Sequence, residues 1–374
     1  MIYIHVPFCK SRCLYCDFFS STRSDLQSRW VEALRGEMLA RRAEIGAAGA
    51  ETVYIGGGTP SLLGRGVLAK VFDSLAEVLG GLEGCAEITV EVNPDDVDGG
   101  YAELLRSMPV NRVSMGVQTF DDGLLGLIGR RHSGSQALGA VELLRGAGFE
   151  NISVDLMYGL PGQTMEMWRR DIDVVMGLGV EHLSAYALQW EEGTALWRML
   201  ERGDVHEADE ELSVMMYDFL VDTVTAPSGL GGGGMVHYEI SNFARPGFRS
   251  RHNSGYWADV PYVGLGPGAH SYDGERRRSW NGTDLLAYCE CGGRVVPEVE
   301  VLSDDELYDE LVMKRLRTCE GLCLDMVPER YVAHLMKMAE CHIEGGRLEL
   351  DEGHLRLTRR GIFTSNDIMS DLML

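Results

Sequence analysis

Short apolar runs alternate with longer amphipathic stretches along the first half of the chain. Between the runs, apolar residues recur every three or four positions, as in Leu26, Trp30 and Leu34, which is typical of a helix with one buried face. A further helix is predicted around Val141, with Ser135 as its N-cap. The apolar runs have the length of strands and cover 2–6, 52–55, 88–92, 113–117, 152–157 and 183–188. This alternation predicts parallel βα units and an α/β fold.

Three of the predicted strands carry a polar side chain out of phase with their apolar ones. Glu91, Gln118 and Asp155 each follow the opposite alternation from the apolar residues of their own strand. Because successive side chains of a strand point to opposite faces, these three are expected to reach one interior. They also lie near the carboxyl ends of the strands, where parallel βα folds place their active sites. Each residue alone can instead satisfy backbone groups at the end of a barrel.

A glycine-rich turn over 56–60, Gly-Gly-Gly-Thr-Pro, follows the second predicted strand. Glycine lets backbone N–H and C=O groups approach a ligand closely, and it also permits a tight turn from strand to helix. The turn is expected on the same rim as the loop that follows the first strand. That position favours contact with a ligand.

Beyond residue 190 the alternation of strands and helices fades. The segment 227–234 is rich in glycine and predicts a flexible loop. The segments 238–244, 251–257 and 264–270 look like loops with many aromatic residues and histidines. Such loops suit a flat aromatic ligand or a metal, and a packed irregular segment is the alternative.

The last part of the chain has the pattern of a separate small module. An amphipathic helix is predicted over 304–317 and a β-hairpin over 347–357. Helices followed by such a hairpin indicate a winged-helix-like α+β domain that covers the main fold. The expected domains are 1–225, 226–300 and 301–374.

Composition and charge limit the class of protein. A chain of 374 residues with 45% hydrophobic content can form one large core and a smaller domain. A formal charge of −23 argues against a nucleic-acid partner, whose phosphates would require basic stripes. No apolar stretch approaches the roughly 20 residues of a membrane span, and the start lacks a secretion signal. We therefore expect a cytoplasmic protein whose nine cysteines are reduced.

Cys9, Cys13 and Cys16 follow the first apolar run directly. An iron–sulfur cluster is normally held by four cysteines, so three on one loop predict a cluster with one iron open to another ligand. Two alternatives share this spacing. A zinc site could recruit His5 as a fourth ligand, and Cys13 with Cys16 could act as a redox dithiol.

Taken in order, these motifs resemble the radical S-adenosylmethionine (SAM) superfamily, and within it the oxygen-independent coproporphyrinogen III oxidase (HemN-like) group. The residues that carry the resemblance are 3–9, the three cysteines, 56–60, Glu91, 116–118, 130–132 and 155–161. It implies a partial (β/α)6 barrel with a 4Fe–4S cluster after the first strand. It also implies SAM bound to the open iron and cleaved by one electron to a 5′-deoxyadenosyl radical.

The resemblance assigns roles to residues by matching positions. It implies that Cys9, Cys13 and Cys16 hold the cluster. It implies SAM contacts at Tyr3, Gly57, Gly58, Thr59, Glu91, Gln118, Arg130 and Asp155. It assigns no catalytic residue, and the sequence of this chain leaves open whether SAM is cleaved in function or only bound.

Two departures from the oxidase pattern resemble the heme chaperone (HemW-like) subfamily. The oxidases have a long arm before the cysteines and a fourth cysteine, whereas here Met1 lies almost on the motif and Phe18 takes the fourth position. The segment 252–257 also fits the HNxxYW motif of that subfamily.

This subfamily implies that the protein binds heme or a related tetrapyrrole, with His252 as a ligand or pocket residue, and delivers it to respiratory proteins. It also implies an electron donor such as flavodoxin or ferredoxin. Oxidation of coproporphyrinogen III is the alternative, and radical methylation is a third possibility.

Overall fold

One curved sheet of nine strands forms the centre of the molecule. The computed structural model describes residues 1–227 and 233–374. The strands lie in the order β7-β8-β6-β5-β4-β3-β2-β1-β9, and β1 to β6 run parallel in sequence order. The six parallel strands are β1 (Ile2–Val6), β2 (Thr52–Gly57), β3 (Glu87–Val92), β4 (Arg112–Gln118), β5 (Ile152–Tyr158) and β6 (His182–Ala187). Each overlaps its predicted run, so the predicted α/β fold of parallel βα units is confirmed.

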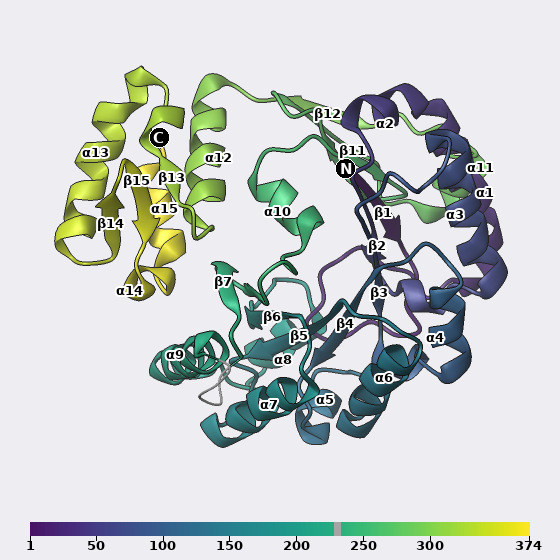
Figure 1. The fold of residues 1–374 in the computed structure, drawn as a ribbon, viewed down its shortest axis with the longest axis horizontal. Helices are drawn as coiled ribbons and strands as arrows, with labels where there is room; N and C mark the ends of the chain where they lie inside the picture. Colours follow the sequence, from purple (N-terminus) through teal and green to yellow (C-terminus); the bar gives the residue numbers. More distant parts are fainter. Residues whose placement is uncertain (228–232) are drawn as a thin grey trace.

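Helices α1, α3, α4, α6 and α7 cover the outer face of this sheet (Figure 1). They bury an apolar side against it, and Trp30 of α1 and Trp168 of α7 are fully buried. These helices leave the inner face of the sheet uncovered, so a site can form there. The helices of this half are α1 (Gln27–Ala40), α2 (Arg42–Ala48), α3 (Arg65–Leu79), α4 (Gly99–Arg106), α5 (Asp122–Leu127), α6 (Gly134–Gly146), α7 (Met165–Leu178), α8 (Ala195–Glu201) and α9 (Glu210–Thr225).

The N-cap of α6 is Ser133, so the prediction of Ser135 was wrong. The Ser133 hydroxyl accepts the backbone N–H of Gln136, and the Gln136 side chain accepts the backbone N–H of Ser133. This reciprocal capping box needs a glutamine or glutamate three residues after the cap. Gln136 supplies it for Ser133 and not for Ser135.

The second half of the chain completes both edges of the sheet. The β7–β8 hairpin pairs antiparallel with β6, and β9 pairs parallel with β1. A separate sheet has the order β10-β11-β12. The elements are β7 (Val236–Glu239), β8 (Asn242–Ala244), α10 (Arg251–Trp257), β9 (Val263–Leu265), β10 (His270–Tyr272), β11 (Arg277–Trp280), α11 (Leu285–Glu290) and β12 (Glu298–Val301).

The prediction that 238–244, 251–257 and 264–270 are loops was therefore wrong. They contain parts of β7, β9 and β10 and all of β8 and α10. Elements such as β8, with three residues, and α10, with seven, are too short to show a period in the sequence. Of the predicted flexible loop 227–234, residues 228–232 lie outside the described residues.

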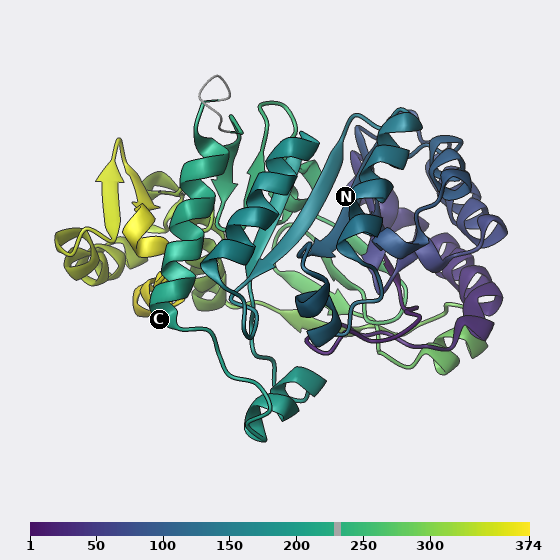
Figure 2. The ribbon, with the colours of Figure 1, turned by 90° about the horizontal axis from the view of Figure 1, so that it is seen from below.

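A small C-terminal module packs beside α9 (Figures 1 and 2). Its sheet has the order β13-β15-β14, and Arg359 binds Asp218 of α9 at 2.7 Å. Its elements are α12 (Asp304–Leu316), β13 (Leu322–Cys323), α13 (Glu329–Glu344), β14 (Leu348–Asp351), β15 (His354–Leu357), α14 (Arg359–Ile362) and α15 (Ser365–Leu372). The predicted helix and hairpin are both present. Across the described part of the chain, no helix has the length and apolarity to span a membrane.

Candidate functional site

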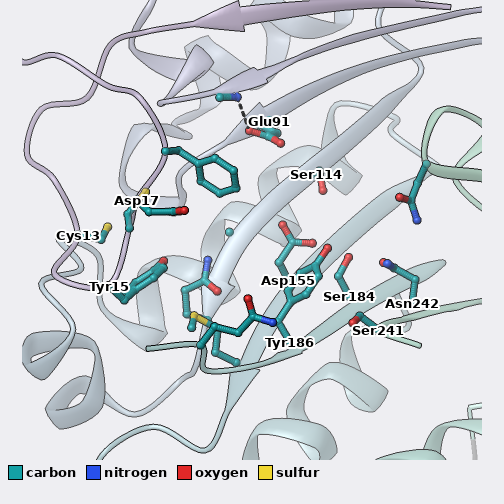
Figure 3. Close-up of a pocket in the computed structure, with 18 of the residues that line it drawn as sticks. Cys13, Tyr15, Asp17, Glu91, Ser114, Asp155, Ser184, Tyr186, Ser241 and Asn242 are labelled. Atoms are coloured by element: carbon teal, nitrogen blue, oxygen red, sulfur yellow. Dashed lines mark hydrogen bonds between the residues drawn. The ribbon is translucent and has the colours of Figure 1, made fainter. Parts of the chain in front are cut away.

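A cavity of about 770 Å³ lies on the inner side of the sheet. The cysteine loop lines one side of it, and β8, α10 and the C-terminal module contribute to the rest. In Figure 3, Cys13 and Tyr15 lie on one side of the cavity, while Ser241 and Asn242 lie on the other. One cavity therefore joins the cysteine motif to the second half of the chain.

Backbone hydrogen bonds hold the cysteine loop to three neighbouring segments. The Cys9 N–H donates to the Ser21 carbonyl at 3.0 Å, and the Leu14 N–H donates to the Ile128 carbonyl at 3.0 Å. The Leu14 carbonyl also accepts the N–H of Leu196 in α8 at 2.7 Å. These bonds fix the loop at Cys9 and at Leu14, between the second and third cysteines.

All three cysteines of this loop line the cavity, and all three are free thiols. The Thr59 hydroxyl lies 3.5 Å from the Cys9 Sγ, and Nη1 of Arg130 lies 3.5 Å from the Cys13 Sγ. Donors of this kind stabilise thiolates and tune the potential of a bound cluster. Burial raises the pKa of Cys16 to about 11, so this thiol is protonated near neutral pH and would release its proton on binding a metal. The donor set fits a cluster held by three thiolates.

His5, which a zinc site could recruit, is held away from that role. Its Nε2 lies 2.9 Å from the Phe19 carbonyl, and its Nδ1 lies 3.1 Å from the Tyr3 hydroxyl. Within 1–227 and 233–374, no three His, Cys, Asp or Glu side chains converge closely enough to hold a single metal ion. A cluster places its thiolates on separate irons, so it does not need that convergence.

The glycines at the end of β2 let this turn lie directly against the cysteine loop. A Cβ on Gly58 would lie 2.6 Å from the Phe8 carbonyl oxygen and 2.8 Å from that of Val6. The Gly58 N–H donates to the Val6 carbonyl at 2.7 Å. Gly57 has a φ of +106°, which side chains rarely tolerate. The turn is therefore tight, and it also borders the cavity.

Glu91 faces the cavity from β3, as the alternation predicts (Figure 3). Its carboxylate accepts the Tyr54 hydroxyl at 2.7 Å and the Gly57 N–H at 3.1 Å. Burial raises the pKa of Glu91 to about 7, although both hydrogen bonds oppose this shift. Near neutral pH the residue can therefore hold or release a proton beside the glycine turn.

Asp155 and Gln118 face the same cavity from the neighbouring strands. Figure 3 shows Asp155 near Ser114 and Ser184, and burial raises the pKa of Asp155 while Ser184 partly offsets the effect by hydrogen bonding. Gln118 has a φ of +71°, at a bulge between β4 and β5. The predicted convergence of three polar side chains on one interior is thus confirmed.

Arg130 connects this polar group to the cysteine loop. Besides Cys13, it donates to the Asn93 side chain and to the Gly116 carbonyl. Tyr3, Gly57, Gly58 and Thr59 also line the cavity. The cavity is therefore lined by all three cysteines and by every residue that the sequence resemblance expects to contact SAM.

His252 lies on the cavity wall in α10, at 1% exposure. Its Nδ1 lies 2.8 Å from the Thr52 hydroxyl, and its Nε2 lies 2.9 Å from the Tyr256 hydroxyl. Burial lowers the pKa of His252 to about 3, so the imidazole is neutral. With both nitrogens hydrogen-bonded, the geometry favours a pocket residue over an iron ligand.

Glu87 holds α10 in this position. Its carboxylate accepts the backbone N–H groups of Arg251 at 2.9 Å and His252 at 3.0 Å. A carboxylate at the amino end of a helix is favoured by the unpaired N–H groups there.

The cavity also has lining residues that the sequence reasoning missed, namely Tyr54, Arg112, Ser114, Ser184 and His182. Ser114 and Arg112 lie on the same face of β4 as Gln118, because every second residue of a strand points to the same side. The alternation along the whole of β4 could therefore have predicted that they face the cavity.

Comparisons with known proteins agree with this geometry. Residues 3–175 match the model of the radical SAM superfamily, and residues 302–364 match that of the HemN C-terminal domain. The chain is 35% identical to the heme chaperone HemW of Bacillus subtilis over 98% of this chain and 97% of that protein. It is 36% identical to the heme chaperone HemW of Mycobacterium tuberculosis H37Rv over 100% of this chain and 94% of that protein.

The fold also matches a solved structure along the whole chain. Coproporphyrinogen III oxidase (HemN) from Escherichia coli superposes with a TM-score of 0.82, covering 100% of this chain and 89% of that one. The two sequences are 22% identical, so this match shows the common fold. Together with the match of residues 3–175 to the radical SAM superfamily model, it confirms a barrel of the radical SAM type with an additional C-terminal domain.

Proposed function

The chain belongs to the HemW family of radical SAM proteins, and from this premise we propose that it carries heme in the cavity that also holds its cluster and SAM. The observation that supports the proposal is the continuity of the cavity. The cysteine loop and the HNxxYW helix, α10, both line it, although they are distant in sequence. A ligand bound against α10 would share this space with the cofactors.

The residues at the cysteine end fit a 4Fe–4S cluster and SAM. Cys9, Cys13 and Cys16 would hold three irons and leave the fourth to SAM. When bound, the cluster supplies single electrons to SAM. The chain itself supplies hydrogen bonds to the sulfurs from Thr59 and Arg130. The side chains and backbone that would contact SAM are those of Tyr3, Gly57, Gly58, Thr59, Glu91, Gln118, Arg130 and Asp155.

The other part of the cavity suits a flat, mostly apolar ligand. The ring of His252 lies 5.2 Å from that of Tyr54 and 4.9 Å from that of Tyr256, measured between centroids. All three residues line the cavity, and His252 is neutral. Aromatic walls with a few fixed polar groups are typical of cofactor and ligand pockets. We assign this part to heme or a related tetrapyrrole.

The relatives named heme chaperones suggest what happens to the ligand. We infer that this protein passes heme to respiratory proteins in the cytoplasmic compartment, and that an electron donor such as flavodoxin or ferredoxin reduces its cluster. Heme is then cargo, and the account requires no conversion of the porphyrin.

Heme titration of the purified protein tests the proposal. The wild type is expected to take up heme saturably, with about one equivalent per chain, because the proposal places one heme against the aromatic wall at α10. His252→Ala is expected to weaken uptake, while His206→Ala, at an exposed position, should leave it unchanged. An unchanged titration for His252→Ala would remove His252 from the site.

An anaerobic assay with coproporphyrinogen III, SAM and a reductant separates this proposal from the oxidase alternative. A carrier is expected to give no product. Formation of protoporphyrinogen would contradict the carrier function, whatever the heme titration shows.

A further inference from the structure

A buried arginine in the cavity has no role in the site described so far. Arg112 is the first residue of β4, is 2% exposed and lines the cavity. Its Nε has no hydrogen-bond partner, and among the described residues Arg112 takes part in no ion pair. A buried, unpaired charge is costly, and such a group in a native fold calls for a ligand, an ion or water.

A second arginine of the cavity, the half-buried Arg130, shows the contrast. Arg130 donates to the Cys13 Sγ, the Asn93 side chain and the Gly116 carbonyl. Its Nε also has no partner, but both of its Nη atoms are held by the chain itself, at the cysteine end. Arg112 begins the same strand that Gln118 ends, so it enters the cavity from the opposite end of β4.

The two imidazoles near Arg112 do not neutralise its charge. His182 is held between two neutral partners, with Nδ1 2.8 Å from the Ser153 hydroxyl and Nε2 2.8 Å from the Tyr238 hydroxyl. Burial lowers the pKa of His182 well below its ordinary value, and the charge of Arg112 lowers it further. The same charge contributes to the lowered pKa of His252, after burial and the N-terminal amine. Both imidazoles are therefore neutral neighbours of a cation.

A second unpaired polar atom lies next to Arg112. Thr89 of β3 pairs in register with Arg112, and its buried hydroxyl also has no hydrogen-bond partner. The carboxyl groups whose pKa the charge of Arg112 lowers are those of Glu91 and Asp155, and both already have other hydrogen-bond partners. Glu91 accepts hydrogen bonds from Tyr54 and Gly57, and Asp155 is hydrogen-bonded to Ser184.

We propose that Arg112 is the anchor for a carboxylate of the cavity ligand, and that this carboxylate is a propionate of the bound tetrapyrrole. The inference rests on the proposed function, because it takes the ligand from there. A guanidinium binds a carboxylate through two parallel N–H···O bonds, which would satisfy the unpaired donors and compensate the buried charge. The aromatic residues Tyr54 and His252, which line the same cavity, would then contact the macrocycle.

Heme and heme dimethyl ester test this assignment, because the ester keeps the macrocycle and iron but has no free carboxylate. Binding of both is measured by Soret absorbance for the wild type, Arg112→Gln and Arg112→Lys. Arg65→Gln, at an exposed position, is the control. The wild type should bind heme at least about tenfold more tightly than the ester, as expected for a charge-assisted pair. Arg112→Gln should bind heme more weakly and the ester with unchanged affinity, and it should thereby lose the preference for heme. Arg112→Lys should keep part of that preference.

SAM binding by the same variants identifies the source of the carboxylate, since SAM also carries one. SAM affinity should be unchanged in Arg112→Gln. A loss of SAM affinity with heme affinity intact would overturn the assignment to the tetrapyrrole. Equal affinity of the wild type for heme and its ester would overturn it without any variant, so the test does not depend on Arg112→Gln folding. Failure of the wild type to bind either compound would instead overturn the proposed function, and this inference with it.

Discussion

The Nδ1 atom of His252 lies 2.8 Å from the hydroxyl of Thr52, which precedes it by 200 residues in the sequence. Thr52 is the first residue of β2, whereas the glycine turn and the cysteine loop follow the ends of β2 and β1. This bond therefore holds α10 at the opposite end of the strands from the cysteines. The two ends of the cavity are built by separate residues.

Removing the Thr52 hydroxyl should destabilise the protein without changing its shape. Thr52→Val leaves a buried ring nitrogen without its partner, which is expected to lower the free energy of unfolding by about 1–3 kcal/mol. Thr52→Ser keeps the hydroxyl and should lose less. Urea unfolding of the three proteins measures the difference. Equal stability of the valine and serine variants would show that the bond does not hold α10.

Glu91 should make stability fall with rising pH. Its pKa is about 7 in the folded protein against an ordinary value of 4.5, so between these values the folded state keeps a proton that the unfolded state has released. This contribution to the free energy of unfolding is complete below the ordinary pKa of 4.5 and is lost as pH rises through the folded-state pKa of about 7. The total loss is up to about 3 kcal/mol.

Glu91→Gln removes this dependence. In urea unfolding of cofactor-free protein from pH 4 to pH 8, the variant should become progressively more stable relative to the wild type as pH rises. A difference between the two proteins that stays constant with pH would show that the carboxyl group has an ordinary pKa.

Gly58→Ala should separate the glycine turn from the cysteine loop. The new Cβ would lie 2.6 Å from the Phe8 carbonyl oxygen, so the backbone must shift. We expect a loss of about 1–3 kcal/mol in unfolding free energy and impaired SAM binding. Gly66→Ala is the control, since a Cβ there meets nothing within 4 Å and lies in helix α3. Wild-type SAM affinity in Gly58→Ala would contradict the close packing of the turn.

The capping box of α6 gives a stability test that is independent of the site. Ser133→Ala should lower the free energy of unfolding by about 1 kcal/mol, because it leaves the Gln136 N–H without its cap. Ser135→Ala should have little effect, since Ser135 is not the N-cap. Thermal or urea unfolding compares the two. If Ser135→Ala were the more destabilising, the helix would begin later than Gly134.

Much of the fold and the cysteine end of the site could be predicted from the sequence, because both leave periodic or tightly spaced signals. The six parallel strands show as apolar runs, and the phase of Glu91, Gln118 and Asp155 shows that they share an interior. Arg112 follows the same phase, but it stands at the start of its strand and no motif marks it. The alternation at the carboxyl ends of the strands therefore does not point to Arg112.

The environment of His252 could not be predicted. The motif 252–257 suggested an exposed loop, yet the segment is a helix in which His252 is buried and whose position depends on Thr52 and Glu87. Contacts between residues so far apart leave no local pattern. Its two hydrogen bonds also change the chemistry expected of the imidazole, since a neutral ring with both nitrogens engaged fits the wall of a pocket better than a free iron ligand.

The central claim is that one cavity holds a cluster site and a heme site made by different residues. Its most direct test is heme uptake by Cys13→Ala after anaerobic reconstitution, with iron and sulfide counted in the same samples. The wild type, and Cys341→Ala at an exposed position far along the chain, should hold about four irons and about four sulfides and bind heme saturably. Cys13→Ala should lose the cluster and keep heme binding. Loss of heme binding together with the cluster would contradict the claim.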